Sequence, residues 1–115
     1  MNEFEAVVWL VQHKKEQLIN RLSRWVEQTE GPLSTPCQLW HGVTQHNGYG
    51  RVNFRVNKVH RYFMVHRLAL ILKLGRPIKK GADAAHRCHR RNCMEHLFEQ
   101  PHRENCRDRS ARVKT

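Results

Sequence analysis

The chain has 115 residues, and 21 Lys and Arg against 10 Asp and Glu give a formal net charge of +11. A chain this short supports one domain with a modest core, to which a metal ion or a partner subunit would add stability. The charge excess favours a polyanionic partner, most often nucleic acid, and no stretch approaches the roughly 18 apolar residues of a membrane span. No export leader is recognisable at the N-terminus, so we expect no membrane association and a cytoplasmic protein.

The first segment, residues 1–30, is predicted to be helical. Apolar residues from Phe4 to Val26 recur at steps of three and four, which is the period of one helix face. The pattern fits one long helix or two short helices that meet near residues 13–15, and Gly31 and Pro32 would end it. The apolar face either packs on the rest of the domain or forms a dimer surface.

A hairpin is predicted next. In residues 51–56, valine and phenylalanine alternate with arginine and asparagine, which is the period of a strand with one buried face. The turn is expected near Asn57 and Lys58. The opposite face carries Arg51 and Arg55, and such a ribbon has the width to enter a DNA major groove, although a solvated basic face is the alternative.

Residues 66–75 have the apolar density and the closing glycine of a buried helix, and residues 76–84 are expected to form a loop. Beyond Pro101 the sequence is charged and compatible with a short helix. Residues 107–115 are expected to be a basic tail.

The stretch AHRCHRRNCMEHL, residues 85–97, has the residue types of a metal site. Cys88, Cys93 and His96 supply three zinc ligands within nine residues. Buried cysteines with surface histidines are the alternative reading. Cys37, just before the hairpin, is the best candidate for the fourth ligand, with His89 and Cys106 as weaker candidates.

A family resemblance rests on fragments that follow one another between residues 37 and 106: CQLWHG, NGYGRVNF, VHRLAL, AHRC, RNC, EHL and EN. In this order they resemble the HNH endonucleases of the ββα-metal superfamily, and most closely the zinc-containing branch with the His-Cys box homing endonucleases and small phage-type HNH proteins. The resemblance implies an α+β fold. It comprises a small ββα-metal nuclease core with a structural zinc, over residues 37–106, preceded by an antiparallel hairpin and an N-terminal amphipathic helix.

The same resemblance implies roles for individual residues. His86 would be the general base, and Asn105 would be a ligand of one catalytic divalent cation, Mg²⁺ or Mn²⁺. Where many relatives have an aspartate before the catalytic histidine, this chain has Ala85, and the nearest acid is Asp83. The structural zinc would be held by Cys37, Cys88, Cys93 and His96, with a spacing from Cys93 to His96 that is two residues shorter than in many relatives.

Double-stranded DNA is the expected partner, bound by basic side chains near the site or on the hairpin. A monomer would nick, and cutting both strands would require a homodimer. We expect the protein to be associated with the nucleoid through DNA. The arginines in question are Arg51, Arg55, Arg67, Arg87, Arg90 and Arg91, for which a solvated basic surface is the alternative.

The leading hypothesis is therefore a metal-dependent DNA endonuclease that hydrolyses phosphodiester bonds. A second hypothesis is a zinc-stabilised nucleic-acid-binding module without catalysis, which explains the charge and the cysteines equally well. A third, a disulfide-stabilised basic protein that acts on membranes, predicts export and paired cysteines. Of the remaining histidines, His66 is expected to support the core or the site, and His102 to be a solvated side chain.

Overall fold

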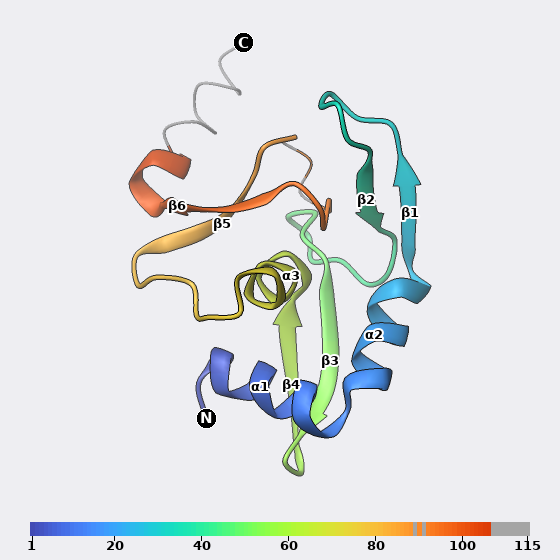
Figure 1. The fold of residues 1–115 in the computed structure, drawn as a ribbon, viewed down its shortest axis with the longest axis vertical. Coiled ribbons are helices and arrows are strands. Elements are labelled where there is room, and N and C mark those ends of the chain that lie inside the picture. Colours follow the sequence, from blue (N-terminus) through green and yellow to red (C-terminus); the bar gives the residue numbers. More distant parts are fainter. Residues whose placement is uncertain (89, 91, 107–115) are drawn as a thin grey trace.

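The computed structural model describes residues 1–88, 90 and 92–106, which form a compact α+β domain (Figure 1). Its strands pair as antiparallel two-stranded sheets, β1 with β2, β3 with β4, and β5 with β6. Within the described residues, no helix has the length and apolar character needed to cross a membrane. The elements in chain order are α1 (Glu3–His13), α2 (Lys15–Arg24), β1 (Val26–Thr29), β2 (Cys37–Trp40), β3 (Arg51–Val56), β4 (Val59–Met64), α3 (Val65–Leu74), β5 (Ala82–His86) and β6 (Leu97–Pro101).

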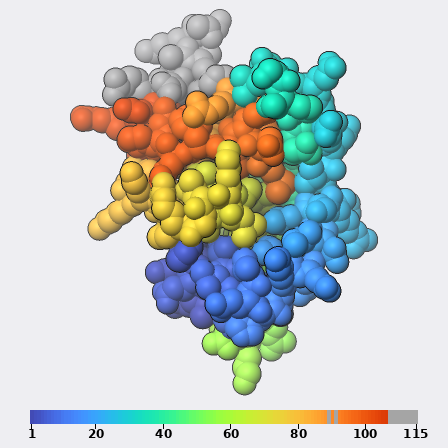
Figure 2. Space-filling view, viewed as in Figure 1, coloured from blue at the N-terminus to red at the C-terminus, as the bar shows by residue number. Residues whose placement is uncertain are grey.

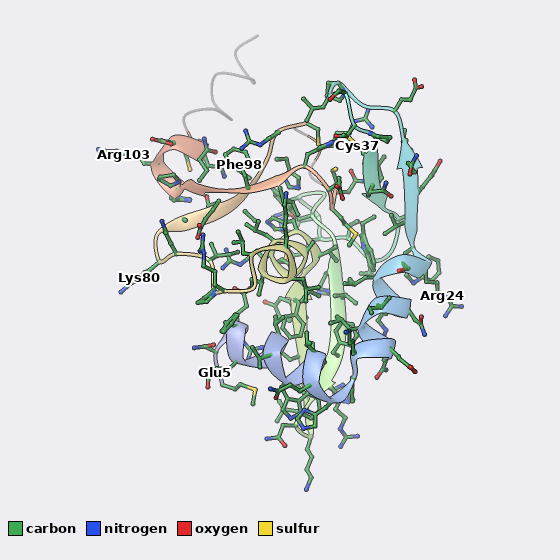
Figure 3. All side chains as sticks on the ribbon, viewed as in Figure 1. Glu5, Arg24, Cys37, Lys80, Phe98 and Arg103 are labelled. Carbon is green, nitrogen blue, oxygen red and sulfur yellow. The ribbon has the colours of Figure 1, made fainter. Side chains whose placement is uncertain are left out.

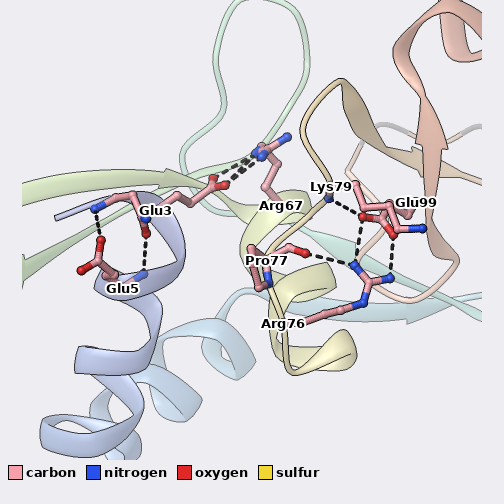
Figure 4. Close-up of polar contacts among 8 residues, drawn as sticks. Glu3, Glu5, Arg67, Arg76, Pro77, Lys79 and Glu99 are labelled. Carbon is pink, nitrogen blue, oxygen red and sulfur yellow. Dashed lines mark hydrogen bonds and ion pairs between the residues drawn. The ribbon is translucent and has the colours of Figure 1, made fainter.

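The N-terminal segment forms two helices, which decides between the two possibilities left by the sequence. Asn2 and Glu5 form a reciprocal capping box at the start of α1: each side chain accepts a hydrogen bond from the backbone N–H of the other, at 2.8 and 3.1 Å (Figure 4). Lys14, with φ −138° and ψ 36°, interrupts the helical backbone before α2. The side chains that these helices bury are Ala6, Val7, Leu10, Leu18 and Leu22.

The prediction of helix up to residue 30 is wrong at its end. The second helix ends at Arg24, and residues 26–29 are strand β1, in which Val26 lies opposite Trp40 and Thr29 opposite Cys37. The spacing of Val26 from the preceding apolar residues fits a helix face. Pairing with β2, however, gives its backbone hydrogen bonds that local periodicity does not reveal.

The predicted hairpin is confirmed. Strands β3 and β4 are joined at Asn57 and Lys58, whose φ angles of 46° and 71° are both left-handed, as a tight two-residue hairpin turn requires. Val52, Phe54 and Val56 are buried, whereas Arg55 is exposed. The apolar face of the hairpin therefore packs on the core, and its polar face meets solvent.

Helix α3 joins the hairpin to the C-terminal half of the domain. Leu68 and Ile71 pack with the hairpin and the N-terminal helices, while Leu70 packs against Ala84 of β5 and Leu97 of β6. The helix ends at Gly75, whose φ of 69° is the left-handed conformation common after the last turn. In the space-filling view, the blue N-terminal helices and the orange-to-red C-terminal segments lie at different ends of the molecule (Figure 2).

Residues 82–84, which we expected in a loop, belong to β5. This strand pairs with β6, from Ala82 opposite Pro101 to His86 opposite Leu97. Residues 102–106 are helical. The order at the C-terminal end of the described chain is therefore strand, strand, helix, and the segment between the two strands contains most of the predicted zinc ligands.

Candidate functional site

A cluster of three thiols and one imidazole is buried between β2 and the segment that joins β5 to β6. The ligand atoms of its four residues all lie within 4.8 Å of one another. The Nδ1 atom of His96 lies 3.6 Å from the sulfur of Cys37 and 3.7 Å from that of Cys93. Tetrahedral zinc, with bonds of about 2.3 Å to sulfur and about 2.05 Å to nitrogen, separates such atoms by about 3.6 Å. The donor set therefore fits zinc, and it consists of Cys37, Cys88, Cys93 and His96.

Backbone pairing brings these residues together across the sequence. Residues 92–94 lie along β2: Trp40 N–H donates to the Asn92 carbonyl at 2.8 Å, and Met94 N–H donates to the Gln38 carbonyl at 2.7 Å. This pairing places Cys93 beside Cys37. Cys37 begins β2 and is labelled in Figure 3. Cys37 is thus the fourth member, as predicted, and His96 belongs to the cluster despite its shortened spacing from Cys93.

The surroundings lower the pKa of one thiol of the cluster and raise the pKa of the other two. Burial raises the pKa of Cys37 and raises that of Cys88 to about 12. Burial also acts on Cys93, but the backbone groups of His96, Glu95 and Gln38 outweigh it and lower the pKa of this thiol. A zinc ion would have to displace protons from the remaining thiols as it binds.

A threonine that the sequence analysis did not single out fixes the imidazole of the cluster. The hydroxyl of Thr35 lies 2.6 Å from Nε2 of His96, so Nδ1 faces the thiols. Hydrogen bonds of this kind hold a ligand ring in the orientation and tautomer that a metal needs. The only signal in the sequence is the nearness of Thr35 to Cys37.

We therefore expect Thr35→Val, which keeps the shape of the side chain but removes the hydroxyl, to weaken zinc binding by about 10- to 100-fold. The measurement is a competition titration with a chromophoric zinc chelator. Thr44→Val serves as the matched control, because Thr44 lies outside the cluster. Equal zinc affinity in the two variants would contradict the assigned role of Thr35.

His86 lies at the end of β5, beside this cluster. Its Nε2 atom is 3.0 Å from the carbonyl oxygen of Cys93. A carbonyl can only accept a hydrogen bond, so Nε2 carries the proton of the neutral ring and Nδ1 carries the lone pair. The backbone of a cluster residue thus sets the tautomer of His86.

Two further rings stack beside His86. The ring centroid of His66 lies 5.6 Å from that of His86 and 4.6 Å from that of Tyr49. Burial, together with the positive charges that His86 and Arg67 can carry, lowers the pKa of His66 to about 3. His66 is therefore neutral at neutral pH, in keeping with its expected supporting role, and Tyr49 is a neighbour that the sequence analysis missed.

Asn105 lies in the helical segment after β6 and bonds back to β5. Its Nδ2 donates to the carboxylate of Asp83 at 3.1 Å, and Nδ1 of His102 lies 2.6 Å from the same carboxylate oxygen. The His102 side chain is 63% exposed, as expected of a solvated side chain, and it also contacts Asp83. The fold brings Asn105 to the strand that ends at His86, with an acid beside it.

The predicted DNA-binding arginines divide into groups. Arg55 is exposed, and Arg51 lies over the ring of Tyr62 at 5.8 Å. Arg67 is partly exposed and donates two-pronged hydrogen bonds to Glu3 at 2.8 to 3.2 Å (Figure 4). The others are Arg87, whose guanidinium lies 4.3 Å from the Phe98 ring centroid, Arg90, whose charge acts on Cys37, and Arg91, which is outside the described residues.

Neither of the two weaker candidates for a zinc ligand is found in the buried cluster of the described residues. Cys106 lies near His102, with its sulfur 3.5 Å from Nε2, and is not part of the buried cluster. His89 is outside the described residues.

Comparisons of the chain with protein-family models, with curated proteins and with solved structures found no match, so its function is inferred from its own residues.

Proposed function

We propose that this chain is a metal-dependent DNA endonuclease of the HNH type, in which His86 is the general base and one divalent cation assists. The observation that supports this best is the contact of the Cys93 carbonyl with Nε2 of His86, at 3.0 Å. It gives His86 the tautomer that a base requires. The resemblance stated above and the strand, strand, helix order around the cluster support the same proposal.

His86 would act on the water that attacks the phosphorus atom. Nδ1 takes a proton from this water, while Nε2 stays on the Cys93 carbonyl. The hydroxide forms a bond to phosphorus, the bond to the 3′ oxygen breaks, and that oxygen takes up a proton from solvent. The products are a 5′-phosphate and a 3′-hydroxyl.

Asp83 and Asn105 would hold the divalent cation. A carboxylate and an amide oxygen are ligands of the kind that Mg²⁺ and Mn²⁺ prefer. The two side chains are neighbours, since Nδ2 of Asn105 donates to the Asp83 carboxylate at 3.1 Å, and the amide oxygen of Asn105 would have to face the cation. Asp83 therefore supplies the acid that position 85 lacks. When bound, such a cation stabilises the negative charge that develops on the phosphate and on the leaving oxygen.

The zinc cluster would affect catalysis only by holding His86 in position and would take no part in the reaction itself. Its four protein ligands leave no open coordination site for chemistry. Cys93, however, has two functions: its sulfur belongs to the cluster, and its carbonyl holds His86. Loading the cluster with zinc would therefore also fix the base.

Double-stranded DNA is the proposed substrate, on the strength of the net charge of +11 and the exposed basic face of the hairpin. A monomer carries one such site and would nick. A homodimer would be required to cut both strands, and the protein would act in the cytoplasm on the nucleoid.

One observation favours the non-catalytic alternative, a zinc-stabilised nucleic-acid-binding module. Both His102 and Asn105 direct nitrogen atoms at the carboxylate of Asp83, so this group has protein partners at hand. In that case Asp83 would fasten the C-terminal helical segment to β5, and His86 would be a structural histidine.

Cleavage of supercoiled plasmid with Mg²⁺, with Mn²⁺ and with EDTA separates the two functions. We expect nicked product that needs the cation, and a rate at least about 100-fold lower in Asn105→Ala and in Asp83→Asn, because each removes a ligand of the cation that stabilises the developing negative charge. Asn20→Ala, at an exposed position of α2, is the matched control. Absence of product with every cation, from zinc-loaded protein that still binds DNA, would favour the binding module.

A further inference from the structure

A cleft of about 550 Å³ opens beside β3, and its lining includes His41 but neither His86 nor any of the cluster cysteines. One wall comes from the end of α2 and from Trp25, and the other from β3 and from the chain that follows β2. Its volume lies within the range of roughly 300–1,000 Å³ that is usual for small-molecule sites. None of the residues assigned above to the zinc cluster or to the cation lines it.

The cleft is positively charged. Arg21 and Arg51 line it, and its lining contains no Asp or Glu. Arg21 is held in place, since one N–H donates to the Asn53 carbonyl and the guanidinium lies 5.0 Å from the centroid of the Phe54 ring. An arginine fixed in this way is already ordered and offers its other N–H groups to an anion such as phosphate.

An aromatic surface accompanies these charges. Trp25 lines the cleft and is 47% exposed, whereas Trp40, beneath it, is 2% exposed and belongs to the core. The guanidinium of Arg24 lies 5.4 Å from the Trp25 ring centroid, but Arg24 does not line the cleft. Trp25 therefore offers exposed aromatic surface to the cleft.

The cleft lies close in sequence to the stacked rings of Tyr49, His66 and His86. Arg51 is the first residue of β3, and two residues earlier Tyr49 stacks on His66, which stacks on His86. The ring centroid of Tyr49 lies 6.2 Å from that of His86, so one short segment of chain connects the surroundings of His86 to the cleft.

We propose that this cleft binds one unstacked nucleotide of a single-stranded or locally opened DNA, with its base on Trp25 and its phosphate between Arg21 and Arg51. A nucleotide combines two interactions at such a site: its base stacks on the exposed indole, and its phosphate pairs with the guanidinium groups. This inference holds whether or not the chain cleaves DNA, because it uses neither His86 nor the cation ligands.

The test measures the binding of a fluorescein-labelled single-stranded octamer, and of the duplex with the same sequence, to the full zinc-loaded chain by fluorescence anisotropy. We expect Trp25→Ala to weaken binding of the single strand by about 10- to 100-fold, while Trp25→Phe, which keeps an aromatic face, loses much less. The effect on the duplex should be smaller. Quenching of tryptophan fluorescence by dAMP should be lost in Trp25→Ala.

A second basic residue serves as the control for the loss of positive charge alone. Arg51→Ala should weaken octamer binding more than Lys80→Ala, which removes the same charge at a residue that does not line the cleft. The proposal is overturned if Trp25→Ala binds the octamer as tightly as the parent, or if Arg51→Ala and Lys80→Ala weaken it equally. Quenching by inorganic phosphate as strong as by dAMP would also overturn it.

Failure of this inference and failure of the nuclease proposal give different results. If the protein binds the octamer through Trp25 but does not cut plasmid, the nucleotide cleft is supported and the nuclease proposal fails. If the protein cuts plasmid but binds the octamer independently of Trp25, the nuclease is supported and the nucleotide cleft fails. Zinc content and thermal unfolding of each variant show that it is folded before binding is measured.

Discussion

Cys93→Ser is expected to abolish zinc binding and to unfold the domain at room temperature. The apparent free energy of binding a structural zinc is about 10–16 kcal/mol, which is comparable with the total stability of about 5–15 kcal/mol of an ordinary domain. Cys93 is fully buried, and its backbone joins the β5–β6 connection to β2. Loss of the metal therefore removes the link between two parts of the chain that are distant in sequence.

The measurement is zinc content by native mass spectrometry together with thermal unfolding followed by circular dichroism. Cys106→Ser is the matched control, because Cys106 is a partly exposed cysteine outside the cluster. It should retain one zinc per chain and unfold at the temperature of the parent. A Cys93→Ser protein with the zinc content and unfolding temperature of the parent would show that the cluster is not a zinc site.

The sequence was sufficient to predict the elements whose signals are local. The alternation in residues 51–56, the turn at Asn57 and Lys58, and the closing Gly75 of α3 are all found in the structure. In each case, neighbouring residues carry the pattern that decides the conformation. Cys37 was predicted as fourth ligand because the zinc chemistry required a partner outside the cysteine-rich stretch.

The features that the sequence analysis missed depend on contacts between distant residues. Strand β1 exists because residues 26–29 pair with residues 37–40, although Val26 also continues a helical spacing. The hydroxyl of Thr35 contacts His96 across 61 positions, and Asn105 meets Asp83 across 22. Periodicity does not reveal partners at such separations, so supporting residues of a site are harder to predict than its cysteines and histidines.

The pairing of residues 92–94 with β2 has a consequence for how the site is built. It brings the sulfur of Cys93 to the zinc cluster and turns the carbonyl of the same residue to His86. Folding, metal binding and orientation of the proposed base are therefore joined at one residue. We expect any change that loosens this pairing to affect all three together.

His86→Ala is expected to lower the rate of plasmid cleavage by about 10²- to 10⁴-fold, while zinc content and DNA affinity stay at the level of the parent. A general base lowers the barrier of the chemical step and adds little to binding of the substrate. The side chain is partly exposed at the end of β5, so its removal should leave the core intact. The rate is measured at saturating protein with Mg²⁺ or Mn²⁺, and DNA affinity by anisotropy with EDTA present.

Two further variants separate the loss of the base from a change of structure. His86→Gln can still donate a hydrogen bond to the Cys93 carbonyl but has no basic nitrogen, so it should be as inactive as His86→Ala while matching the parent in stability. His60→Ala removes an exposed histidine of β4 and should cleave normally. Cleavage by His86→Gln at the parent rate would show that His86 acts by holding the backbone at Cys93, and the proton acceptor would then have to be another group.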